Sequence, residues 1–275
     1  SIEPIAPEAE VTMRLVDAHC HFDFPRFDGV REQELAAAAK GGVRALVVPG
    51  VRRADWDRVQ ALANPARGIW YCLGIHPWFV EEHTAADLEL LGQRLGSYPD
   101  GCIGVGECGL DGLKGSFEEQ LPWFRAQIQL ATRHDYPLVI HSVKAHDQVH
   151  AALRAERWQG RALVHGFSGS YQQASKLVDL GCYIGVGGVI THDRARKTRD
   201  AIGRLPAEAL VLETDAPDMA PAGVEKGMNS PACLPAILDC LARLRGQDAE
   251  ALAEVLLANV SRLYGRSESV LAPSG

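Results

Sequence analysis

Residues 138–165 read LVIHSVKAHDQVHAALRAERWQGRALVH, and this stretch decides the fold. It begins with a short apolar run, continues with helix-like spacing near 145–156, and ends with a second apolar run. Neither run contains a polar residue before its terminal histidine, which is typical of strands buried on both faces. A strand, a helix and a second strand in this order predict a βαβ unit with parallel strands.

The same alternation extends over most of the chain. Strand-like runs lie at 14–17, 44–49, 69–74, 103–107, 138–141, 162–165, 182–186 and 210–213, and helix-like segments follow them from 31–41 to 248–263. Eight repeats of strand then helix predict an α/β fold, a single (β/α)8 TIM-type barrel. A doubly wound open sheet is the alternative. It is disfavoured because no GxGxxG motif opens a helix after the first strand.

The 275 residues are expected to form one domain, because no linker rich in Pro, Gly or Ser interrupts them. We predict a flexible N-terminal tail over 1–12, the barrel over 13–265 and a flexible C-terminal tail over 266–275. The first residues are acidic and contain proline, unlike the basic start of a signal peptide. No apolar run approaches the ~20 residues of a membrane span, so no membrane association is expected.

Cysteine usage and charge narrow the class of protein further. The seven cysteines show no CxxC pair or disulfide-framework spacing, which predicts free thiols in a reducing compartment and so a cytoplasmic location. The net charge of −7 argues against a broad surface that coats duplex nucleic acid, since such a surface is basic. A phosphate-bearing substrate stays compatible, because a bound metal ion supplies positive charge locally.

Histidines and carboxylates gather at the C-terminal ends of the predicted strands. His19 and His21 follow the first run, and residues two apart on an extended chain project to the same side. Other strand ends carry His76, Glu107, His141, His165 and Asp215. In a barrel all these ends meet on one face, which is the face that carries the active site.

Six of these residues are predicted metal ligands: His19, His21, Glu107, His141, His165 and Asp215. A site for one catalytic ion usually needs three protein ligands, so six favour two ions that share a bridge. The expected cofactor is one or two divalent ions, with Zn, Mn, Ni, Fe and Mg as candidates. The alternative is a buried polar network without metal, which is disfavoured because unpaired imidazoles are costly to desolvate. The other histidines are predicted to be solvated: His83, His134, His146, His150 and His192.

These residues, in this order, resemble the TatD family of metal-dependent hydrolases in the amidohydrolase superfamily. The motifs span residues 14–264 and read Asp17-Ala-His19-Cys-His21-Phe-Asp23, Gly74-Ile-His76-Pro77, Gly106-Glu107-Cys-Gly-Leu-Asp111, Ile140-His141-Ser142, Val164-His165-Gly-Phe-Ser-Gly169 and Leu212-Glu213-Thr-Asp215-Ala-Pro217. Residues 185–188 and 215–219 resemble most the YjjV-like subgroup of this family.

The resemblance implies a hydrolase that acts on ester bonds, often with two metal ions. By position, His19 and His21 would bind one ion, His141 and His165 the second, and Glu107 would bridge them.

The remaining carried-over roles concern the reaction. Asp215 would bind the first ion, orient the attacking water and accept its proton, so Asp215 and Glu107 are the predicted catalytic residues. His76 is expected near the substrate phosphate. Asp17 or Glu213 could orient a ligand imidazole.

Members of the family include 3′-to-5′ exonucleases, so the expected substrate bears phosphate, with single-stranded DNA ends as the candidate and no obligate protein partner. Two family arginines are missing, since this chain has Ser142-Val143-Lys144 and Met228-Asn-Ser-Pro231 at their places. Lys144 and Lys226 are the predicted substitutes in substrate binding, although a lysine cannot make a bidentate fork.

Two alternatives stay open for the function. The chain could hydrolyse a small ester, amide or lactone with no nucleic-acid role, because the same metal chemistry serves carbonyl substrates. A binding protein with a vestigial site is disfavoured by the presence of all six ligand-type residues. Trp78, Phe79 and Phe167 lie near the predicted site and could stack bases or wall a small pocket.

Overall fold

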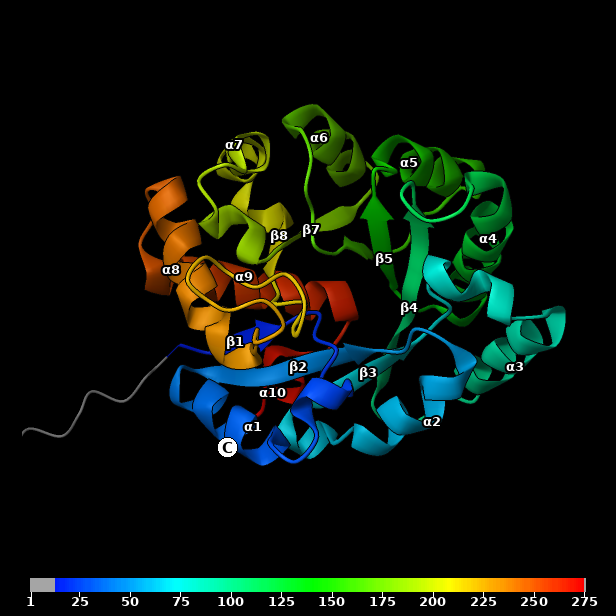
Figure 1. Cartoon of the computed structure of the whole chain (residues 1–275), viewed down its shortest axis with the longest axis horizontal. Coiled ribbons are helices and arrows are strands. Elements are labelled where there is room, and N and C mark those ends of the chain that lie inside the picture. The colour runs from blue at the N-terminus through cyan, green and yellow to red at the C-terminus, as the bar shows by residue number, and fades with distance from the viewer. Residues whose placement is uncertain (1–12, 275) are drawn as a thin grey trace, which may run out of the picture.

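The computed structural model describes residues 13–274, and it confirms the predicted (β/α)8 barrel. The strands form one sheet in chain order, each parallel to the next, and Figure 1 shows the helices arranged around them. The strands are β1 (Leu15–Asp17), β2 (Val43–Pro49), β3 (Ile69–Leu73), β4 (Cys102–Asp111), β5 (Leu138–Val143), β6 (Ala162–Val164), β7 (Cys182–Val186) and β8 (Leu210–Leu212).

All the helices but the last lie close to the segments predicted from the sequence, and the last, α10 (Glu268–Leu271), lies within the predicted C-terminal tail. They are α1 (Arg31–Lys40), α2 (Arg53–Leu62), α3 (Ala85–Gly96), α4 (Phe117–His134), α5 (His146–Ala155), α6 (Tyr171–Asp179), α7 (Arg196–Arg204), α8 (Leu234–Arg245), α9 (Ala249–Tyr264) and α10 (Glu268–Leu271). Local sequence fixes several of their ends. Ser116 caps α4 and Asp248 caps α9 by accepting backbone N–H groups, and Gly265 ends α9 in a left-handed conformation.

Side chains alternate between two layers of core along each strand. Residues such as Val47 and Val139 fill the inside of the barrel, whereas Leu46 and Leu138 pack outward against the helices. Because both faces of every strand are buried, the apolar runs contain few polar residues before they reach the end that carries the site.

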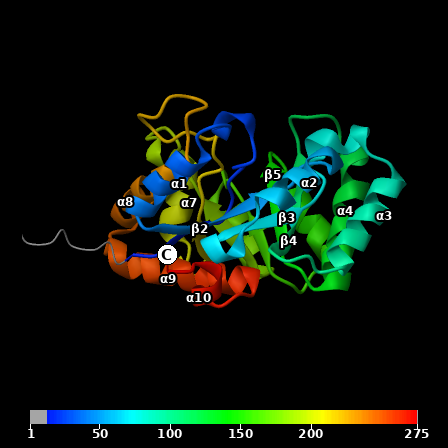
Figure 2. The ribbon, with the colours of Figure 1, turned by 90° about the horizontal axis from the view of Figure 1, so that it is seen from below.

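Helices α9 and α10 close the barrel at the end opposite the long loop before α8, as Figure 2 shows. The Nε1–H of Trp70 donates to the carbonyl of Leu271 at 2.8 Å, and the hydroxyl of Tyr264 donates to the carbonyl of Ala18 at 2.9 Å. The prediction of a flexible tail over 266–275 is therefore corrected: within the described part, residues 268–271 are helical and Leu271 is buried. The predicted tail over 1–12 lies outside the described residues.

The seam between the first and last strands lies directly beneath the predicted site. The backbone N–H of Ala18 donates to Leu212 at 3.0 Å, and the N–H of Asp215 donates to His19 at 2.9 Å. These bonds join the segment after β1 to the segment after β8, so the seam itself positions side chains from both ends of the chain.

Glycine permits a close approach between β4 and β5. Gly109 has φ 139°, and a Cβ atom there would collide with the backbone carbonyl of His141. Strand β4 therefore continues past its predicted end at Glu107 to Asp111, and it carries both carboxylates alongside the end of β5.

Two further expectations concern the state of the cysteines and the absence of a membrane-spanning helix. All seven cysteines are free, and five are buried, with Cys233 and Cys240 partly exposed. Across residues 13–274, no helix is long and apolar enough to cross a membrane.

Candidate metal centre

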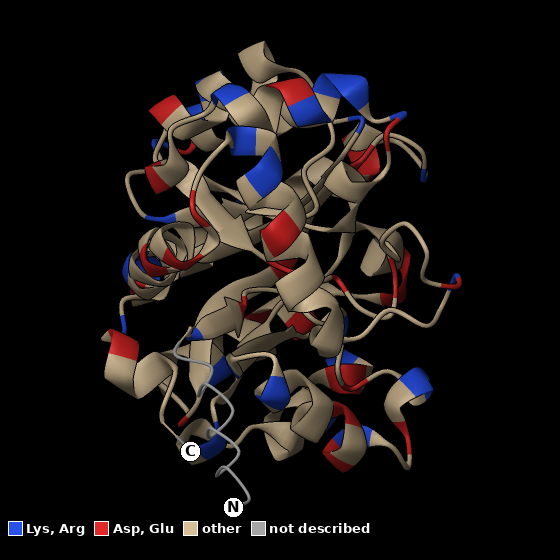
Figure 3. Cartoon of the chain, turned by 90° about the vertical axis from the view of Figure 1, so that its left-hand side faces the viewer, with Lys and Arg blue, Asp and Glu red and all other residues tan. Residues whose placement is uncertain are grey.

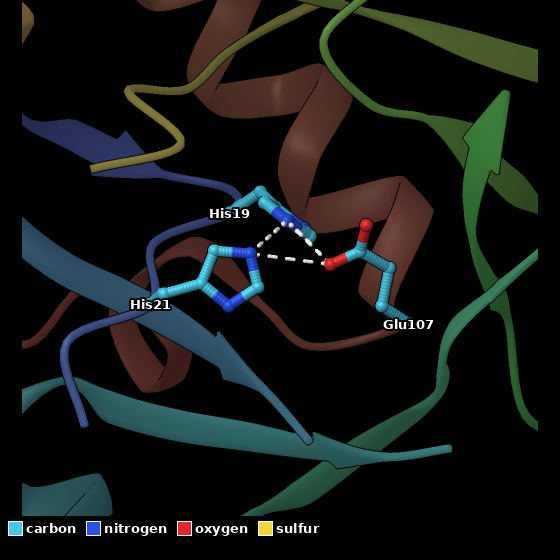
Figure 4. A group of neighbouring side chains, drawn as sticks. All are labelled: His19, His21 and Glu107. Atoms are coloured by element: carbon cyan, nitrogen blue, oxygen red, sulfur yellow. Dashed lines mark hydrogen bonds and ion pairs between the residues drawn. The ribbon is translucent and has the colours of Figure 1, made fainter. Parts of the chain in front are cut away.

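The first group of side chains joins the end of β1 to β4 and to the segment after β8. The Nε2 atoms of His19 and His21 lie 3.3 Å apart. Each lies 3.2 Å from Oε2 of Glu107 and 3.2 Å from Oδ1 of Asp215. Figure 4 shows both imidazole rings facing the Glu107 carboxylate. Asp215 has φ 54°, a left-handed conformation that Asp adopts more readily than most residues.

The spacing of this group fits a metal ion. Ligand atoms on a tetrahedral ion with bonds of about 2.0–2.1 Å lie about 3.3–3.4 Å apart. Within the described chain, Oε2 of Glu107 and Oδ1 of Asp215 are buried without a hydrogen-bond partner. A buried carboxylate oxygen without a partner is costly, and a cation among these atoms would satisfy both. The donor set of two nitrogens and two oxygens suits a divalent ion such as Zn or Mn.

The other oxygen of Glu107 faces a second group of histidines. Oε1 lies 2.6 Å from Nε2 of His165, 3.1 Å from Nδ1 of His141 and 3.2 Å from Nε2 of His76. Glu107 thus presents one oxygen to each group, which is what a carboxylate that bridges two ions must do. The ring of His165 stacks on that of His19 with centroids 3.8 Å apart, so the two groups are in contact.

His76 differs from the other imidazoles in its hydrogen bonds. Its Nδ1 accepts the backbone N–H of Trp78 at 3.1 Å, at the start of the short helix Pro77–Glu82. A neutral imidazole whose Nδ1 accepts carries its proton on Nε2, the atom that faces Glu107. Burial lowers the pKa of His76 and so favours this neutral form. His76 therefore presents an N–H donor to the site, whereas a metal ligand must present a lone pair.

Asp111 belongs to the site, although no role was predicted for it from the sequence. Its Oδ2 accepts from Nε2 of His141 at 2.8 Å and from Nε1 of Trp78 at 2.7 Å. A carboxylate that holds one ring nitrogen of a histidine fixes the orientation of the other, and Nδ1 of His141 faces Glu107. The sequence held a signal, since Glu107 and Asp111 are four apart and therefore share one side of a strand.

The charges of the cluster oppose one another at close range. Burial alone would raise the pKa values of Glu107 and Asp215, but the surrounding histidines hold both well below their usual range, so both are ionised. Burial alone would lower the pKa of His19, but these two carboxylates raise it to about 10. Burial lowers the pKa of His165 to about 4 against the pull of Glu107. Two buried carboxylates thus require positive charge between them, which a divalent cation also supplies.

Two buried carboxylates behind the site differ in what they touch. Asp17 accepts the backbone N–H of Thr214 at 2.9 Å, its hydroxyl at 2.5 Å and the N–H of His19 at 3.3 Å. These bonds brace backbone across the seam and involve no imidazole ring. Oε1 of Glu213 accepts the N–H of Gly166 and lies 3.8 Å from Nδ1 of His165. Of the two residues expected to orient an imidazole, Glu213 is the one that lies beside a ring.

Lys144 and Lys226 are exposed, on the segments that follow β5 and β8. Neither makes a hydrogen bond or ion pair with the cluster within the described chain, so their place in substrate binding stays a prediction. The expectation of solvated histidines fails at His83 and His146, which are buried. Backbone groups explain their burial, because His83 contacts Arg53 and Phe79 and His146 contacts Ser168.

Comparison with known proteins gives one consistent result. The model of the TatD related DNase family matches residues 16–265. The "Uncharacterized metal-dependent hydrolase YjjV" of Escherichia coli (strain K12) is 42% identical over 253 residues, which cover 91% of this chain and 98% of that protein. The "3'-5' ssDNA/RNA exonuclease TatD" of the same strain is 33% identical over 246 residues, which cover 86% of this chain and 93% of that protein.

The solved structure of YjjV from Escherichia coli K12 has a TM-score of 0.88 to this chain at 41% sequence identity. The alignment covers 93% of this chain and 99% of that one. The family match over residues 16–265 includes all the residues of the cluster.

Proposed function

The chain belongs to the TatD family of metal-dependent hydrolases, and on that premise we propose that it removes nucleotides from the 3′ ends of single-stranded DNA. Metal-dependent hydrolysis of ester bonds is the activity that the family membership establishes. The name of the TatD relative, an ssDNA/RNA exonuclease, supports the finer assignment of a nucleic-acid end.

One observation carries the proposal: His76 presents an Nε2–H donor beside a cluster of ligand-type side chains. A phosphodiester oxygen is an acceptor and needs such a donor. The carboxylates and the lone pairs of the other imidazoles cannot supply one while they hold metal.

The residues of the cluster divide the work of the reaction. On this proposal His19, His21 and Asp215 would hold a first divalent ion, His141 and His165 a second, and Glu107 would be shared between them. Such ions would lower the pKa of a water molecule and polarise the phosphoryl oxygen.

We assign to Asp215 the orientation of the attacking water and the acceptance of its proton, which the 3.2 Å distances from its Oδ1 to Nε2 of His19 and of His21 support. The N–H of His76 would donate to an oxygen of the substrate phosphate. Glu107 keeps the two groups of ligands at a fixed separation through its two oxygens.

The charges on one side of the molecule bear on the kind of substrate. On the side that Figure 3 shows, Lys and Arg are interspersed with Asp and Glu over the helices. A mixed surface of this kind does not attract a long duplex, whereas a strand end needs only the site itself.

The test is hydrolysis of 5′-labelled single-stranded oligonucleotides by metal-replete protein. Wild type is expected to shorten the strand from its 3′ end. Asp215→Asn is expected to lower kcat by at least about 100-fold, the usual size of a general acid–base contribution, while much of the metal stays bound.

Asp193→Asn removes an exposed carboxylate at the same end of the barrel and serves as the matched control, with unchanged kcat expected. Near-wild-type turnover by Asp215→Asn would remove that residue from the mechanism. Hydrolysis of small esters or lactones without cleavage of any oligonucleotide would refute the nuclease assignment.

A further inference from the structure

An exposed indole stands beside the metal centre, and the proposed reaction does not use it. Trp78 is 52% exposed, although it follows His76 by only two positions. Its ring centroid lies 5.1 Å from that of His76 and 6.0 Å from that of His141. A large apolar surface therefore borders both histidines and remains open to solvent.

The indole is held in a fixed orientation. Its Nε1–H donates to Oδ2 of Asp111, the oxygen that also accepts from His141. Oδ1 of Asp111 accepts the N–H of Leu113 at 2.8 Å, and Gln120 binds the backbone N–H and carbonyl of Asp111 at 2.7 and 3.0 Å. The ring is thus oriented before any ligand arrives, which reduces the entropy lost when a ligand stacks on it.

A cation accompanies the indole. Nζ of Lys114, in the segment between β4 and α4, lies over one face of the Trp78 ring, 5.0 Å from its centroid, and leaves the other face for a base. Sites for single-stranded nucleic acid combine aromatic surfaces for the bases with positive charge for the backbone. Trp78 and Lys114 supply both within one small cluster, next to the N–H donor of His76.

We propose that Trp78 is the stacking platform for the base of the nucleotide at the cleaved end, with Lys114 beside the adjoining phosphate. Asp111 is a positioning residue that holds the platform and His141 as one unit. The proposal rests on the nucleic-acid substrate proposed above. It adds that the site distinguishes an end that bears a base from a bare sugar–phosphate end.

The test compares equilibrium binding of two hydrolysis-resistant single-stranded oligothymidylates, one intact and one whose 3′-terminal residues lack bases. Stacking on an aromatic side chain gains at least about fivefold per base, so wild type is expected to bind the intact strand at least about fivefold more tightly. Trp78→Leu is expected to remove this preference, and Trp78→Phe to keep most of it because the ring remains.

The control is Tyr98→Leu, which removes another exposed aromatic side chain. Tyr98 is 60% exposed and precedes the N-terminal end of β4, which is the end away from the site. It is expected to keep the full preference. With cleavable strands, Trp78→Leu is expected to raise KM with little change in kcat. Asp111→Asn is expected to change both, because it releases the platform and His141 together.

Equal binding of the two strands by wild type overturns the proposal, and so does a preference that survives in Trp78→Leu. A preference that Trp78→Leu abolishes and Tyr98→Leu retains supports it. Cleavage is scored separately. If wild type binds the intact strand more tightly but hydrolyses only small planar esters, the nuclease assignment is wrong, whereas the assignment of Trp78 as the stacking surface for a base is still supported.

Discussion

Glu107 is the residue that joins the two groups of the candidate metal centre. It is the only side chain of the described cluster whose two oxygens face separate groups of imidazoles. Its position follows from β4, which carries it between β3 and β5 and buries it almost completely. A change at this residue therefore affects both groups at once.

Glu107→Gln is expected to lower the metal content of the purified protein, because an amide removes the negative charge that both groups of ligands share. Elemental analysis after dialysis against a defined metal buffer measures this. Glu118→Gln, an exposed position on α4, is the control and is expected to retain metal. Equal metal in both variants would mean that Glu107 is not a ligand.

His146 gives stability a pH dependence of known sign. Its Nδ1 pairs with the hydroxyl of Ser142 at 2.7 Å and its Nε2 with the carbonyl of Ser168 at 2.8 Å. Burial lowers its pKa below the ordinary 6.5, so the unfolded chain binds the proton more readily. The stability that neutral His146 contributes is present above pH 6.5 and is lost as the pH falls below it.

Urea unfolding of wild type and His146→Gln at several pH values between about 5 and 8 checks this, since glutamine does not titrate there. The stability difference between the two proteins is expected to shrink as the pH falls. A difference that stays constant over this range would contradict the assignment.

At the scale of the elements, α10 shows why a very short helix cannot be predicted from the periodicity of apolar residues. It has four residues, too few for a periodic apolar stripe, and its burial depends on Trp70, which is 201 positions away. Asp111 was missed for a related reason. The expected strand ended at Glu107 because a charged residue normally ends a buried run, whereas β4 continues with the carboxylate turned into the site.

Trp70→Phe is expected to lower the free energy of unfolding by about 1–3 kcal/mol, because the buried carbonyl of Leu271 loses its hydrogen bond. Urea unfolding measures the change. Trp158→Phe is the control, since its buried Nε1 has no partner within the described chain and its loss breaks no hydrogen bond. Activity is expected to persist in both, because Trp70 contacts the end of the barrel opposite the site. Equal stability of the two variants would show that the hydrogen bond from Trp70 to Leu271 does not stabilise α10 against the barrel.

At the scale of the whole molecule, the repeated units of strand and helix were the part of the structure that could be predicted from the sequence. Eight alternations of strand and helix, with polar residues at strand ends, were enough for the barrel and for the gathering of the six ligand-type residues on one face. The tautomer of His76 and the shared carboxylate of Asp111 could not be predicted. They depend on hydrogen bonds between segments that only the tertiary structure brings together.

Chelation is expected to destabilise the whole barrel, because a ligand bound only to the folded state adds RT ln(1 + [L]/Kd), about 2.7 kcal/mol at 100 times Kd. Calorimetry with and without a chelator measures the shift in melting temperature. The double variant His19→Ala, His21→Ala lacks half of the first group and is expected to show a smaller shift. An equal shift in both proteins would place the stabilising ion elsewhere.

The hydrogen bonds across the seam have a consequence for the order in which the molecule is made. Asp17 and Thr214 are 197 positions apart, yet they are hydrogen-bonded to each other next to the first group of ligand-type residues. A nascent chain on the ribosome has His19 and His21 long before Asp215 emerges, and it cannot complete this contact until the eighth strand is released. On the proposed ligand assignment, the full set of ligands exists only after nearly the entire chain is translated, and a product that ends before β8 lacks Asp215.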